Sequence, residues 1–145
     1  MNELNSNYLN DLKNDHKTLG RLLEDIKGLV QTNDIQGIAT RMDSLRNGLL
    51  AHLKKEDDKI YMDLLTIAKE KNIELVTITI NTFSTAMKGI ATRVLKFFDK
   101  YSKREEIAKL SSELYNDFPL VYEDLLKRVD REEKVLYPMY EKYCC

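Results

Sequence analysis

Two short stretches of the sequence carry side chains that suit a metal ion. His52 is followed four residues later by Glu56, and Arg128 is followed four residues later by Glu132. Because four residues make about one turn of an α-helix, both side chains of each pair point the same way. Imidazole and carboxylate groups together suit Fe(II), Zn(II) or Mn(II). The first pair therefore has the chemistry of a ligand set, whereas the second keeps only the carboxylate.

The sequences around the two pairs are also alike. LLAHLKKEDDKIYM at 49–62 matches LLKRVDREEKVLYPM at 125–139, and the main difference is that Arg128 stands where the first copy has His52. We interpret the two stretches as helices that face one site, in which half of a metal-binding set has been replaced.

Composition limits the classes of function. The net charge is −1 and there is no basic block, so nucleic acid is not expected as a partner. No apolar run approaches the length of a membrane span, and the first residues lack the apolar segment of a signal peptide. We therefore expect a cytoplasmic protein without a membrane partner.

Apolar residues at helical spacing predict the elements that position these side chains. A stripe that includes His16 runs along the first segment, and His52 and Glu56 lie on the stripe of the second. Pro119 lies inside the fourth segment and predicts a kink or a restart there. The expected helices cover about 9–30, 34–70, 75–101 and 107–139. We predict an all-α fold, an antiparallel up-down four-helix bundle, as a single domain over 1–145 with a frayed tail at about 137–145.

Several motifs in this order resemble the hemerythrin-like domain of the bacterial HHE cation-binding type. They are Asp15-His16, HLKKEDDKIY at 52–61 and LLKRVDREEKVLYP at 125–138, within a resemblance that spans roughly 8–143. In that family, histidines and two bridging carboxylates from four helices hold a pair of non-haem irons. The resemblance implies that the ligands here are His16, His52, Glu56 and Glu132.

The rest of the family's ligand set is replaced in this chain. Met87 stands where the third helix would supply a histidine, and Arg128 stands where the fourth would. The resemblance therefore implies one iron ion rather than two, with zinc or manganese as alternative metals. Reversible O₂ binding draws an electron from each of two irons, so a site for one ion argues against O₂ carriage.

Arg128 leaves a metal-free alternative open. A guanidinium between Glu56 and Glu132 could neutralise both carboxylates with fork-like hydrogen bonds and stand where a second cation would lie. Its long stem could instead carry the charge outward to solvent. Tyr61 and Tyr137 follow the glutamates by five residues, about 140° round an α-helix, so neither is expected to be a ligand. Glu133 is expected to point away from the site.

Three functions follow from these features. The first is a metal-binding protein that senses or buffers iron, oxygen or redox state. The second is a metal-free helical-bundle regulator that acts on a partner protein, because the run at 123–134 also resembles the regulator-of-sigma-D family of anti-sigma factors. The third is a di-iron enzyme, which the replacements at Met87 and Arg128 disfavour. Cys144 and Cys145 are expected to be a reduced tail without a role in the site.

Overall fold

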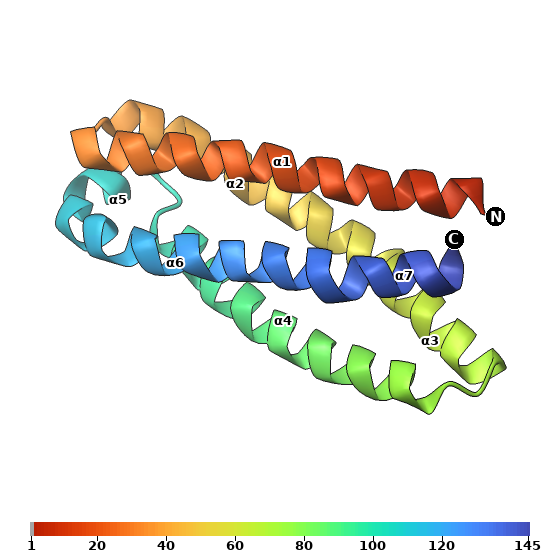
Figure 1. Cartoon of the computed structure of the whole chain (residues 1–145). Helices are drawn as coiled ribbons and strands as arrows, with labels where there is room; N and C mark the ends of the chain where they lie inside the picture. Colours follow the sequence, from red (N-terminus) through yellow and green to blue (C-terminus); the bar gives the residue numbers. More distant parts are fainter. Residues whose placement is uncertain (1) are drawn as a thin grey trace.

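The computed structural model describes residues 2–145 and consists of four long helical rods (Figure 1). Two of the rods contain a short π-helix, labelled η, and a short helix α5 (Arg104–Lys109) precedes the last rod. The rods are α1 (Glu3–Thr32); α2 (Ile35–Lys55), η1 (Glu56–Ile60) and α3 (Tyr61–Glu70); α4 (Glu74–Lys100); and α6 (Ser111–Arg131), η2 (Glu132–Leu136) and α7 (Tyr137–Cys144).

The rods alternate in direction, so that the two ends of the chain lie at the same end of the molecule (Figure 1). The described residues contain no β-strand. The prediction of an antiparallel up-down four-helix bundle is thus confirmed. The fourth segment does not restart at Pro119, because α6 continues through this residue. The helix is interrupted earlier, at Leu110 between α5 and α6.

The predicted apolar stripes form the core. Leu12, Ile26, Leu45 and Val94 are fully buried, and each side chain of this kind contributes about 1.5–3 kcal/mol by leaving water. At the C-terminal end of α4 the core contains aromatic rings, of which Phe97 and Tyr101 lie 4.9 Å apart between centroids. The polar cluster described below interrupts this core near the middle of α1.

Capping residues set the turn between the first two rods. Asn33 adopts a left-handed conformation, with φ of 55°, and ends α1 by donating its N–H to Leu29 and Val30. Asp34 then begins α2, because its side chain accepts from the Gly37 N–H at 3.0 Å. A Cβ at Gly37 would lie 2.8 Å from the Asp34 carboxylate, so glycine permits this cap.

The end of the chain, for which we expected a frayed tail, is helical through α7 as far as Cys144. Tyr137 and Tyr140 of α7 are buried, and the Tyr140 hydroxyl donates to Asp63 at 2.5 Å. The Asn5 amide donates to the Cys144 carbonyl at 2.7 Å, which ties α7 to α1. Within residues 2–145, none of the helices combines the length and the apolar character that a membrane span requires.

Candidate metal centre

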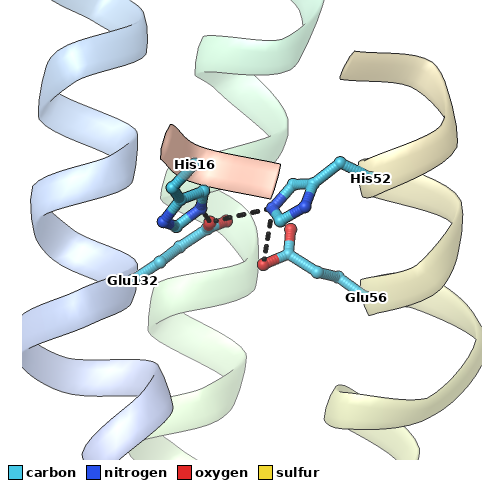
Figure 2. Close-up of side chains that lie close together, drawn as sticks. All are labelled: His16, His52, Glu56 and Glu132. Carbon is cyan, nitrogen blue, oxygen red and sulfur yellow. Dashed lines mark hydrogen bonds and ion pairs between the residues drawn. The ribbon is translucent and has the colours of Figure 1, made fainter. Parts of the chain in front are cut away.

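Four polar side chains converge inside the bundle. His16 comes from α1, His52 from the last turn of α2, Glu56 from the first position of η1 and Glu132 from the first position of η2. Figure 2 shows the four side chains pointing toward one another from three of the rods. One ligand atom from each lies within 4.8 Å of the others, and none of the four residues is more than 6% exposed.

The two histidines present their Nε2 atoms to the carboxylates. His16 Nε2 lies 2.7 Å from Glu132 Oε1, and His52 Nε2 lies 3.4 Å from both Glu132 Oε1 and Glu56 Oε2 (Figure 2). Two nitrogens and two oxygens therefore line one small volume. These are the donors that Fe(II), Zn(II) and Mn(II) take in proteins.

Carboxylates outside the cluster fix both imidazole rings. His52 Nδ1 donates to Asp15 Oδ2 at 2.9 Å, and His16 Nδ1 donates to Glu133 Oε1 at 3.2 Å. Lys55 holds Asp15 in place through a 3.0 Å contact to the same oxygen. When such a ring gives up its Nε2 proton, the Nε2 lone pair can bind a metal while Nδ1 still donates to the carboxylate, as in the carboxylate–histidine pairs around bound metals. The donor set therefore fits a cation in both chemistry and orientation.

Arg128 lies against the opposite side of the two glutamates. Its Nε donates to Glu132 Oε2 at 3.0 Å and its Nη2 donates to Glu56 Oε1 at 3.2 Å. Its Nη1 donates to the Met87 carbonyl at 3.0 Å. Arg128 is 6% exposed, so it bridges the carboxylates and does not extend to solvent. Each carboxylate thus turns one oxygen to the guanidinium and the other to the histidines.

The π-helix η2 changes the direction of the residue five positions beyond Glu132. In η2 the Tyr137 N–H donates to the Glu132 carbonyl, an i→i+5 bond that places Tyr137 directly above Glu132. The Tyr137 hydroxyl consequently enters the cluster and donates to Glu56 Oε2 at 3.0 Å. The expected rotation of about 140° is wrong for Tyr137, because it assumed an uninterrupted α-helix.

The electrostatics of the two glutamates differ. Burial alone would raise the pKa of Glu132, but hydrogen bonds from His16 and His52 and the charge of Arg128 outweigh burial and hold that pKa well below its usual range. Burial raises the pKa of Glu56, and the nearby charge of Glu132 adds to the shift. Burial also raises the pKa of Tyr137, so its phenol is the protonated donor in the cluster.

The predicted ligands His16, His52, Glu56 and Glu132 form the cluster, and Arg128 and Met87 lie beside it. Met87 is buried and contributes its backbone carbonyl rather than a ligand. Sequence reasoning missed Tyr137. Glu133 lies on the exposed face as expected, and from there its carboxylate contacts His16 Nδ1. The motif Asp15-His16 indicated the family but did not predict that Asp15 contacts His52. That contact joins two different rods, so no local sequence pattern indicates it.

A small cavity borders the cluster between α1, α2 and α6. Its volume is about 50 Å³, and half of its lining residues are leucines, with His16, His52, Arg128 and Glu132 among the others. This is room for one small molecule, since a water molecule takes about 30 Å³ in the liquid. The arrangement can therefore hold a cation and admit one small ligand beside it.

The chain matches a known protein family. Residues 7–140 match a protein family described as Hemerythrin HHE cation binding domain. The matched region contains the four clustered side chains, Arg128 and Tyr137. No curated protein and no solved structure gives a significant match to the chain.

Proposed function

The chain belongs to the hemerythrin HHE cation-binding domain family, and we propose that it binds a single non-haem metal ion, iron in the first instance, through His16, His52, Glu56 and Glu132. The observation that carries the proposal is the orientation of the histidines. Both rings direct Nε2 inward because Asp15 and Glu133 hold the opposite nitrogens. Zinc and manganese suit the same donors and are the alternative metals.

The contacts of Arg128 support one ion rather than two. In the family the two carboxylates bridge a pair of metals, and here the guanidinium occupies the second side of both. With both imidazoles neutral, two carboxylates and one guanidinium would leave one net negative charge in the core, which favours one added cation. Burial lowers the pKa of His52, but its hydrogen bonds to Glu132 and Glu56 outweigh burial and raise that pKa to about 10, so a bound ion would replace the proton on His52. Met87 offers no imidazole on this side.

A site for one ion suits sensing or buffering of metal, oxygen or redox state. Reversible O₂ carriage in this family uses one electron from each of two irons, and Arg128 takes the place of the second. The bound ion would supply a redox-active or Lewis-acidic centre, and the protein would supply its ligands and the small apolar cavity beside it. We therefore propose a regulatory or storage role rather than oxygen transport.

Metal counting tests the proposal. The chain is purified without a histidine tag, loaded anaerobically with Fe(II), desalted and analysed for metal. We expect about one iron per chain in the wild type and a large loss in His52→Ala. Arg46→Ala is the matched control, because Arg46 lies on α2 and pairs only with the exposed Asp43 at 2.7 Å. Absence of stoichiometric metal, or unchanged binding in His52→Ala, would contradict the proposal.

The second candidate is a metal-free regulator that binds a partner protein. One observation favours it: within residues 2–145, every buried side-chain nitrogen and oxygen has a hydrogen-bond partner without an ion. In that case Arg128 would be the only cation the two carboxylates need. The same metal count separates the candidates, since a metal-free regulator would retain no ion and would give a stoichiometric partner in a pull-down from its own cells.

A further inference from the structure

The Tyr137 hydroxyl lies close to all four members of the cluster. It is 3.0 Å from Glu56 Oε2, 3.1 Å from His16 Nε2, 3.3 Å from Glu132 Oε1 and 3.5 Å from His52 Nε2. The hydroxyl donates its single proton to Glu56, and its oxygen can accept from the imidazole Nε2–H groups of His16 and His52. Once those two nitrogens bind a metal they carry no proton, so the lone pairs of the Tyr137 oxygen would then face the ion and no hydrogen-bond donor.

These separations are those of atoms that share one ion. Ligands about 2.1 Å from a metal are about 3.0 Å apart at right angles and about 3.4 Å apart at a tetrahedral angle. The four distances from the Tyr137 oxygen cover this range. The oxygen therefore stands where a fifth ligand of the same ion would stand.

The phenol ring is held firmly in this position. Tyr137 is 1% exposed, and its ring stacks on His16 with 5.3 Å between centroids and 19° between planes. The i→i+5 hydrogen bond of η2 fixes its backbone above Glu132. Tyr61 has the same offset from Glu56 in η1, yet its hydroxyl makes no hydrogen bond to the cluster in the described chain. The sequence repeat is symmetric here, whereas the structure selects Tyr137 alone.

We propose that Tyr137 is a fifth ligand of the bound ion and coordinates it as a phenolate. This inference rests on the proposed metal binding. On coordination the O–H bond breaks, the oxygen–metal bond forms and the proton leaves to solvent, in the way that a bound cation deprotonates a coordinating thiol. Together with Glu56 and Glu132, the phenolate makes the set rich in hard oxygen donors, which favours Fe(III) over Fe(II).

Visible spectroscopy of the ferric protein tests this assignment. The full chain is loaded with Fe(II) without oxygen and then oxidised by one equivalent of ferricyanide, which takes one electron and becomes ferrocyanide. After desalting, we expect a phenolate-to-Fe(III) charge-transfer band in the visible region. Resonance Raman excitation within that band should enhance tyrosinate ring vibrations. Tyr137→Phe should lose both signals while it retains iron, and Tyr61→Phe, the matched control, should keep both.

The outcomes distinguish this inference from the proposed function. Wild-type protein that retains about one Fe(III) without the band and the tyrosinate vibrations would overturn the role of Tyr137 and leave metal binding intact. Wild-type protein that retains no iron would overturn both. If Tyr137→Phe fails to fold, the wild-type Raman spectrum still shows whether a tyrosinate binds the iron. A charge-transfer band that persists in a folded Tyr137→Phe protein would contradict the assignment. Loss of the band in Tyr61→Phe would contradict it as well.

Discussion

Arg128 and Glu132 form a buried ion pair across one turn at the junction of α6 and η2. Arg128 Nε lies 3.0 Å from Glu132 Oε2, and both side chains are at most 7% exposed. The other oxygen of Glu132 lies 2.7 Å from His16 Nε2. One carboxylate thus separates a permanent cation of the protein from the site proposed for an exchangeable one.

Replacing Arg128 by histidine should change the number of ions bound. The substitution removes the guanidinium and offers an imidazole beside the outer oxygens of Glu56 and Glu132. We expect metal analysis after Fe(II) loading to rise from about one ion per chain toward two. Arg131→His, on the exposed neighbouring position, is the control and should leave the count unchanged. An unchanged count in Arg128→His would show that Arg128 does not stand in for a second metal.

Replacing Asp15 by asparagine should weaken metal binding without removing a ligand. Asp15 holds His52 through Nδ1, and loss of such a partner lowers metal affinity by about 10–100-fold. Competition against a chromophoric chelator would measure the change. Asp11→Asn removes a carboxylate that contacts Lys55 at 2.8 Å but no histidine, and we expect little effect. Equal affinities for Asp15→Asn and wild type would argue against an orienting role.

Metal should stabilise the folded chain. An ion that binds only the native state at about 100 times its dissociation constant adds about 2.7 kcal/mol to the free energy of unfolding. Urea unfolding with and without bound metal measures this difference. We expect it in the wild type and expect it to be nearly absent in His52→Ala. A chelator that leaves the wild-type midpoint unchanged would contradict a metal held by the native cluster.

The ionised Asp117 carboxylate should stabilise the folded protein at neutral pH, and this contribution should be lost in acid. A hydrogen bond from Tyr101 at 2.6 Å and an ion pair with Lys100 at 2.9 Å hold the pKa of Asp117 below its ordinary value. A carboxyl whose pKa is lower in the folded state stabilises the protein above its unfolded pKa, near 3.8, and loses that contribution as pH falls through the folded value.

Acid titration of unfolding would test this contribution. Asp117→Asn should be less stable than wild type at neutral pH and should lose less stability between about pH 5 and pH 2. Asp130→Asn, which removes only the exposed pair with Lys134, serves as the control. Parallel acid profiles for Asp117→Asn and wild type would contradict the assignment.

The apolar stripes and the four clustered side chains could be predicted from the sequence because both follow helical periodicity. His52 and Glu56, and Arg128 and Glu132, lie one turn apart and face inward as expected. Arg128 could have snorkelled outward, and only the structure shows it bridging both glutamates.

The π-helices could not be predicted in the same way. Their sequences, EDDKI and EEKVL, contain no glycine or proline to mark an irregular turn. The Tyr8 hydroxyl donates to the Lys55 carbonyl at 2.6 Å immediately before η1, and this contact between two rods has no local sequence signal. Tyr137 was misplaced because η2 could not be predicted.

Anomalous diffraction from crystals of the iron-loaded chain tests the central claim most directly. Data collected at the iron absorption edge should give one strong peak per chain, enclosed by His16, His52, Glu56 and Glu132, with Arg128 still between the two glutamates. No peak at this position would contradict metal binding by the cluster. Two peaks, with Arg128 displaced from the carboxylates, would contradict a site for a single ion.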